Sequence, residues 1–284
     1  MRKFFLCFFT VFCMCTVFGG CSKTDYSGVS IENIDEVTDG VRSALINRTY
    51  RINVTFNSHA KKMDDEGVAL LAKNIYEAAV SDTGDPRGGA YLRYQTGGYK
   101  VRYKCKKKLN SYEHIIRLLP DYYTTAKEEE EVDRKVDKII RQIKSQLGYD
   151  PSAKLDINDR DTVKKATKLV HDEICDIVTY DDVHGSGNYS HIGASAYCAL
   201  HYHTATCQGY SVLMYRMLTE LGIHNQIVTG DYIDPNGRRE YHAWNMVDVC
   251  STQLAVDTTL DDENDTLDYF LVDPGKLSED HVMM

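Results

Sequence analysis

The first 120 residues contain segments with the hydrophobic period of a helix and segments with the period of a strand. Hydrophobic residues recur every three or four positions over residues 34–45 and 68–79, which predicts two helices. Between them, residues 50–56 alternate in polarity as a half-buried strand does. Residues 91–95 and 99–104 flank Thr96-Gly97-Gly98, which predicts a hairpin. We therefore expect a small α/β subdomain over residues 31–120.

The rest of the chain has longer helical segments, which are followed by strands. The acidic residues 128–131 precede a hydrophobic stripe over residues 132–143, which predicts an amphipathic helix with a favourably negative first turn. The periodicity breaks at residues 148–153, around Pro151, and this break predicts a subdomain boundary. Further helices are predicted at residues 159–174 and 207–221, and strands at 226–229, 241–249 and 254–258. Residues 121–284 are thus expected to form an α+β domain.

The N-terminus has the composition of a targeting segment. Arg2 and Lys3 precede an apolar run over residues 4–18, so residues 1–20 are predicted to be a signal peptide. The run is shorter than the roughly 20 residues that span a bilayer, which disfavours a membrane helix. Phe18-Gly19-Gly20-Cys21 resembles the lipobox of bacterial lipoproteins. The resemblance implies an extracytoplasmic protein at the cell surface, anchored in the membrane through lipid on Cys21, with residues 21–30 as a tether; plain secretion is the alternative.

Charge and cysteine content narrow the range of partners and chemistries. The net charge is −9 and no basic stripe is evident, which argues against nucleic acid as a partner. Beyond the predicted leader and Cys21, five cysteines remain: Cys105, Cys175, Cys198, Cys207 and Cys250. Because this number is odd, at least one thiol stays unpaired in a monomer and is a candidate reactive group.

Cys207 is the cysteine in the most reactive predicted setting, because it lies where a loop becomes a helix. Free backbone N–H groups and the positive end of the helix dipole favour its thiolate, the form that attacks acyl carbons. His242, on a downstream strand, is a candidate base, and Asp257, on the next strand, is a candidate group to orient it. A two-residue turn at Cys250 and Ser251, or a four-residue loop, places Asp257 on the same face as His242; a three- or five-residue loop does not.

Three separated motifs resemble those of the bacterial transglutaminase-like superfamily. They are Thr206-Cys207-Gln208-Gly209-Tyr210, Tyr241-His242-Ala243-Trp244-Asn245 and Val256-Asp257-Thr258-Thr259-Leu260-Asp261-Asp262. The resemblance implies a papain-related α+β core in which a nucleophile helix packs on an antiparallel sheet. It also implies that Cys207 is the nucleophile, His242 the base and acid, and Asp257 the orienting group. Leu260 and residues 253–254 stand where many relatives have tryptophan, and the glycine common before the nucleophile is missing at residues 204–206.

Other site residues and other types of site are also conceivable from the sequence. The backbone N–H of Cys207 is a candidate oxyanion donor, and Gln208, Tyr202 and Trp244 are candidates for contacting the substrate or the oxyanion. His191, His201 and His203 with Cys198 and Cys207 could ligate zinc, but their spacing fits no compact zinc module. Residues 261–265 lack the pattern of a calcium loop and are expected to form a polar turn. We therefore expect neither a metal nor a cofactor.

Three functions follow from these patterns. The first is a cysteine peptidase or amidohydrolase that acts on extracytoplasmic peptide, protein or cell-wall material. The second is a transglutaminase, which forms the same thioester but transfers the acyl group to an amine and crosslinks proteins. The third is a surface-binding module that has kept the fold without the chemistry.

Overall fold

The computed structural model describes residues 10–11, 13–14, 27–28, 34–59, 61–181 and 193–284. Most of the predicted leader, the predicted lipidation site Cys21 and most of the tether lie outside these residues. The chain divides into two compact units, one made of Met1–Ser81 and Thr96–Tyr122 and the other of Asp82–Gln95 and Tyr123–Met284. No helix among the described residues is long and apolar enough to cross a membrane.

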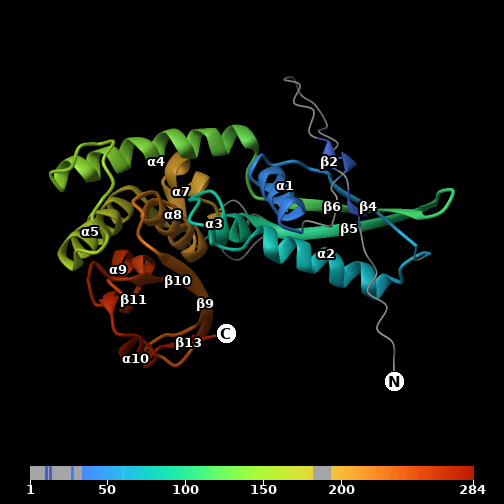
Figure 1. The fold of residues 1–284 in the computed structure, drawn as a ribbon. Helices are drawn as coiled ribbons and strands as arrows, with labels where there is room; N and C mark the ends of the chain where they lie inside the picture. The colour runs from blue at the N-terminus through green and yellow to red at the C-terminus, as the bar shows by residue number, and fades with distance from the viewer. Residues whose placement is uncertain (1–9, 12, 15–26, 29–33, 60, 182–192) are drawn as a thin grey trace. The chain divides into compact units, whose positions relative to one another are not determined.

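The first unit is a sheet with two helices (Figure 1). Its helices are α1 (Ile34–Ile46) and α2 (Asp65–Ala79), and its long strands are β4 (Ile52–Ser58), β5 (Thr96–Lys107) and β6 (Tyr112–Tyr122). The sheet order is β1-β4-β6-β5, with antiparallel pairing and the short strand β1 (Thr10–Val11) at one edge. Alternate residues of β4 are buried, as the period of two predicts. Strands β2 (Cys13–Met14) and β3 (Ser27–Gly28) form a separate pair.

The predicted hairpin around residues 96–98 is wrong. Gly89–Tyr94 forms the short helix α3, and β5 pairs instead with β6 across residues 108–111. Tyr91 and Leu92 are fully buried and consecutive, which a half-buried strand does not allow. A five-residue apolar pattern is too short to distinguish a buried helix from a strand.

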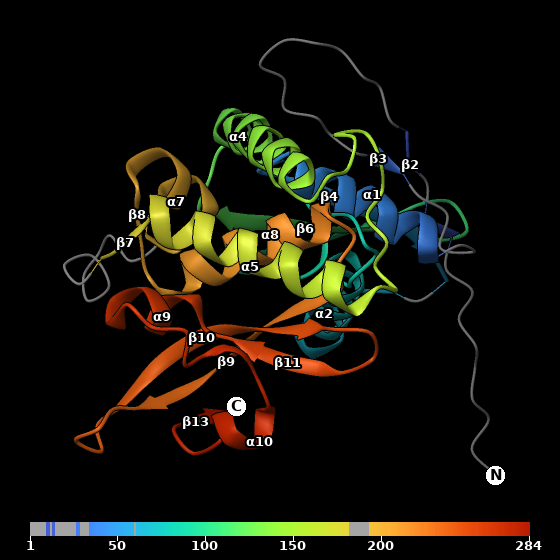
Figure 2. The ribbon, with the colours of Figure 1, turned by 90° about the vertical axis from the view of Figure 1, so that its left-hand side faces the viewer.

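The second unit places helices beside a five-stranded antiparallel sheet of order β12-β11-β10-β9-β13 (Figure 2). The strands are β9 (Asn225–Ile233), β10 (Arg239–Asp248), β11 (Gln253–Val256), β12 (Phe270–Val272) and β13 (His281–Met283). The helices, besides α3, are α4 (Ala126–Gln146), α5 (Arg160–Ile177), α7 (Ala196–Tyr202), α8 (Cys207–Glu220), α9 (Thr258–Asn264) and α10 (Pro274–Leu277). A short parallel pair, β7 (Thr179–Tyr180) and β8 (Thr204–Ala205), precedes α8. The predicted α+β class is confirmed.

Helix α8 lies at the centre of this unit. Eleven of its residues are buried, on every side of the helix, and it ends just before Gly222, whose φ of +81° suits a glycine. Helix α4 begins at the predicted acidic run, where Thr125 and Glu128 form a capping box. The boundary predicted at residues 148–153 is wrong, because α4 and α5 on either side of it both belong to the second unit.

Candidate active site

Cys207 is the first residue of α8 and is 8% exposed. The residue before it, Thr206, makes no side-chain capping bond, so the first N–H groups of the helix are not occupied by a cap. Gly209, one half-turn further, allows the preceding loop to approach closely. A Cβ atom at Gly209 would lie 2.5 Å from the carbonyl oxygen of Gly193. The start of α8 is therefore a close-packed position where N–H groups can stabilise negative charge.

The pairing of β10 with β11 places Asp257 on the same face of the sheet as His242, as the two-residue turn predicts. Strand β10 pairs with β11 so that Asn245 lies opposite Val256. The turn between the strands is centred on Cys250 and Ser251, whose φ angles of 52° and 65° are those of a two-residue hairpin turn. Asp257 follows directly after β11, so it shares the face of His242. The predicted register is confirmed.

Asp257 is fully buried and accepts four hydrogen bonds. Its Oδ2 atom is 2.6 Å from Nε2 of His242, and its Oδ1 atom accepts from the backbone N–H groups of Thr259 and Leu260. Burial alone raises the pKa of Asp257, but His242 and the hydrogen bonds outweigh it and hold this pKa far below the usual range. The strand predicted to reach residue 258 ends at Val256, because Asp257 is the N-cap of α9.

His242 connects the carboxylate to the thiol. It is 5% exposed, and Cys207 is one of the groups that interact with it and raise its pKa. Since Nε2 is bonded to Asp257, Nδ1 is the ring nitrogen that is left to interact with the thiol. Burial lowers the pKa of His242, but the charge of Asp257 and the bonds to Asp257 and Cys207 raise it well above 6.5. The raised pKa favours the imidazolium form of His242.

A second imidazole on Asp257, that of His281, was not found from the sequence. His281 begins β13 near the C-terminus, and its Nε2 atom is 3.0 Å from Oδ2 of Asp257. Its Nδ1 atom is 2.6 Å from Asp280, whose other oxygen accepts from the hydroxyl of Tyr269 at 2.7 Å. Gly230 of β9 permits this strand to pass, because a Cβ there would lie 2.1 Å from the carbonyl oxygen of Val282. The short pattern of β13 gave no signal of this contact.

We expect His281 to position Asp257 rather than to contact the substrate. In His281→Ala, kcat should fall about tenfold with KM little changed, and the free energy of unfolding should fall by about 1–3 kcal/mol because Asp257 loses a buried hydrogen bond. His281→Gln should recover most of kcat, since its amide N–H can donate to Oδ2. Steady-state kinetics and denaturant unfolding of both variants test this, and equal losses of kcat in the two would contradict it.

His242, Asp257 and His281 also form a group of the metal-ligand type. Their donor atoms lie within 4.8 Å of one another, and all three side chains are buried. Each Nε2 atom already has Asp257 as a hydrogen-bond partner, so hydrogen bonding accounts for the group. This group is not the zinc alternative considered from the sequence. Of those residues, His191 is outside the described part, His201 bonds Glu131, and His203 bonds the carbonyl oxygen of Ile177.

The three residues predicted to contact the substrate or the oxyanion differ in their exposure and in their neighbours. Gln208 is half-buried and donates to the carbonyl oxygen of Tyr94 at 2.8 Å, so it supports the wall beside Cys207. Trp244 is 1% exposed and packs edge-on against His281, with ring centroids 4.8 Å apart. Trp244 therefore supports the imidazoles and does not face a substrate, contrary to expectation. Tyr202 is 57% exposed, and its described ring contacts are with Tyr197 and His201.

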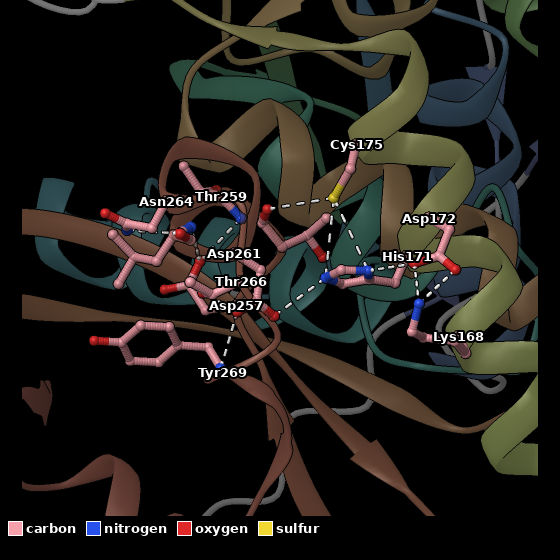
Figure 3. Close-up of polar contacts among 12 residues, drawn as sticks. Lys168, His171, Asp172, Cys175, Asp257, Thr259, Asp261, Asn264, Thr266 and Tyr269 are labelled. Carbon is pink, nitrogen blue, oxygen red and sulfur yellow. Dashed lines mark hydrogen bonds and ion pairs between the residues drawn. The ribbon is translucent and has the colours of Figure 1, made fainter.

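A second cysteine, histidine and aspartate lie together between α5 and α9 (Figure 3). Sγ of Cys175 is 3.9 Å from both ring nitrogens of His171, and Nε2 of His171 is 3.1 Å from Asp261. Burial and the surrounding carboxylates raise the pKa of Cys175 to about 12, so this thiol stays protonated. Asp261 also accepts from the N–H of Tyr269. This group therefore joins two helices and a loop, and residues 261–265 include the end of α9 rather than only a polar turn.

A helix that begins at a cysteine, beside an antiparallel sheet that carries a hydrogen-bonded histidine and aspartate, is the architecture of papain-related thiol proteins. Residues 153–258, which include Cys207, His242 and Asp257, match the family model of the transglutaminase-like superfamily. No curated protein matches the chain.

The solved structures that resemble this chain do so only distantly. A structure described as a TGase is 16% identical, with a TM-score of 0.36. The match covers 74% of this chain and 50% of the TGase chain. A proposed cysteine protease from Cytophaga hutchinsonii is 13% identical, with a TM-score of 0.30, and 65% of each chain is covered. The chain thus spans half the length of that TGase.

Proposed function

We propose that this protein is a thiol enzyme that hydrolyses peptide or amide bonds through Cys207, His242 and Asp257. The observation that carries the proposal is the buried 2.6 Å hydrogen bond between Asp257 and His242, together with the interaction of His242 with Cys207 at the start of α8. All three side chains are at most 8% exposed, so these bonds are shielded from competing water. The family match of the same segment supports it.

The geometry suggests a two-step reaction. The sulfur of Cys207 attacks the carbonyl carbon, and the N–H groups at the start of α8 stabilise the oxyanion that forms. The imidazolium of His242 gives its Nδ1 proton to the leaving amine, and a thioester remains on Cys207. Water, deprotonated by His242, then attacks the thioester and releases the acid. If a primary amine resolves the thioester instead, the same steps give acyl transfer.

The localisation is also part of the proposal. We infer from the leader and Cys21 that the enzyme is held at the outer side of the membrane by lipid, which makes peptides, proteins and cell-wall material the accessible substrates. Incorporation of a labelled fatty acid into the chain, and its loss in Cys21→Ser, would test the anchor independently of the chemistry.

The alkylation rate of each cysteine with iodoacetamide tests the thiolate before any substrate is known. At pH 6 an ordinary thiol with a pKa of about 8.5 is almost fully protonated, so selective labelling of Cys207 at this pH is the result expected of a nucleophile that His242 assists. Cys198 should not react, because burial raises its pKa to about 11, and Cys175 should not react for the reason given above. Peptide mass spectrometry assigns the label to each site.

Two histidine variants sharpen this measurement. His242→Ala should abolish labelling of Cys207 at pH 6, while His224→Ala, which removes an exposed imidazole of the same unit, should not change it. Slow and unselective labelling of the wild-type protein would favour the surface-binding module. Product analysis with an added primary amine would then separate hydrolysis from acyl transfer.

A further inference from the structure

The first unit carries a strongly basic strand on an acidic protein. Residues 96–122 contain seven lysines and arginines and two acidic residues, a net charge of +5, although the whole chain has −9. Lys100, Arg102, Lys104 and Lys106 alternate along β5 and are exposed, so they project from one face of the sheet. The expectation that the chain has no basic stripe is therefore wrong, because the net charge averages over a locally cationic hairpin.

Most of these cations lack a carboxylate partner. Glu113 pairs with Lys106 at 3.3 Å and with Lys108 at 3.0 Å, and these bonds lower the pKa of Glu113 despite partial burial. Lys100, Arg102 and Lys104 make no ion pair within the described part of the chain. Their charges therefore remain available for an anionic partner. Strand β5 is an edge strand, which adds to the accessibility of this row.

The tip of the β5–β6 hairpin combines these charges with an exposed apolar side chain. Leu109 is 95% exposed, in a loop closed by a hydrogen bond from the N–H of Lys108 to the carbonyl oxygen of Ser111 at 2.8 Å. Lys106, Lys107 and Lys108 directly precede it. The segment after β4 contacts this tip, since Nδ1 of His59 lies 3.1 Å from the carbonyl oxygen of Asn110. Exposure of a leucine side chain to water is not stabilising. At a lipid interface the leucine can enter the apolar layer while the neighbouring lysines stay among the headgroups.

We propose that the β5–β6 hairpin docks on a membrane surface that contains anionic phospholipid. The lysines and arginine of β5 would lie against the headgroup phosphates, and Leu109 would enter the layer below them. Nucleic acid explains the charges equally well, but it gives no role to a solitary exposed leucine without an exposed aromatic residue beside it.

The predicted lipid anchor on Cys21 would keep the β5–β6 hairpin close to the membrane surface. Twelve residues separate Cys21 from Ile34, where α1 begins, so the first unit stays within about 45 Å of the lipid. A single lipid chain holds a protein only weakly, and a basic patch is a common second contact. The docking surface lies in the first unit and does not depend on the proposed catalytic function.

The test is cosedimentation with vesicles, using the chain from residue 21 onward with Cys21→Ser, so that no lipid is attached. We expect binding to vesicles of phosphatidylglycerol with phosphatidylcholine, at least tenfold weaker binding to phosphatidylcholine alone, and release by 0.5 M salt. The triple variant Lys100→Glu, Arg102→Glu and Lys104→Glu should bind at least tenfold less. Leu109→Asp should also weaken binding severalfold.

A matched control has the same change of charge elsewhere. Lys127, Arg134 and Lys138 are exposed residues of α4 in the second unit, and their triple change to glutamate should leave vesicle binding within twofold. Circular dichroism and labelling of Cys207 should show that every variant is folded. Equal loss in both triple variants would overturn the proposal, because net charge alone would then explain binding. Wild-type binding to a DNA oligonucleotide as tight as to vesicles, unaffected by Leu109→Asp, would also overturn it.

Discussion

Cys207→Ala should lower the rate of peptide or amide hydrolysis by about five to six orders of magnitude while leaving the fold intact. The variant loses the only atom that can form the thioester, and neither His242 nor Asp257 can replace it. The small change in volume at a helix N-terminus should cost little stability. Release of fluorescent peptides from labelled casein and from cell-wall material, with thermal unfolding in parallel, measures both effects.

The control for this variant is Cys250→Ala, which removes a thiol from the β10–β11 turn in the same unit. Its sulfur contacts the carbonyl oxygen of Asn158 and is far along the chain from the start of α8. Hydrolysis should be unchanged. A Cys207→Ala variant that retained wild-type turnover would exclude the proposed mechanism, and loss of activity in both variants would show that the assay reports stability.

Asp257→Asn should have the second largest effect, because it keeps the shape of the side chain and removes its charge. The amide cannot hold an imidazolium, so turnover should fall by about three to four orders of magnitude. His242 and His281 both lose their buried anionic partner, and breaking such a pair typically costs about 3–5 kcal/mol. Hydrolysis and denaturant unfolding of the two proteins at pH 5.5 measure these losses.

The stability difference between wild type and Asp257→Asn should depend on pH. The lowered pKa of Asp257 means that its contribution is present above the ordinary carboxyl pKa near 4 and is lost as the pH falls. The raised pKa of His242 means that its contribution is complete below about 6.5 and is lost as the pH rises through the raised value. The difference in Tm should therefore be largest between about pH 4 and 6.5.

Asp262→Asn is the matched control, since Asp262 lies on the same helix and accepts a hydrogen bond from the hydroxyl of Tyr210 at 2.6 Å. It should keep most of the activity, because it contacts none of the three catalytic candidates. A difference in Tm between wild type and Asp257→Asn that stayed constant from pH 3 to 9 would mean that packing, not charge, holds Asp257 in place.

Much of the second unit could be predicted from local sequence patterns. The start of α8 at Cys207 and its end before Gly222 follow from apolar spacing and a glycine stop. The register of β10 and β11 follows from the length of one short turn, so the sequence alone predicts that His242 and Asp257 share a face of the sheet. These features depend on neighbouring residues, whose geometry is fixed by the two periods of helix and strand.

The features that the sequence did not determine join segments far apart in the chain. His281 reaches Asp257 only because β13 pairs with β9 past Gly230, and the helical state of residues 89–94 depends on burial within the second unit. Trp244 is buried by a tertiary contact that its own strand does not specify. The row of cations on β5 becomes one surface only when the strand is extended at a sheet edge. The sequence thus determined the local elements and the motif that they carry, while the tertiary structure decided which distant side chains meet, because such contacts arise only when separate elements pack together.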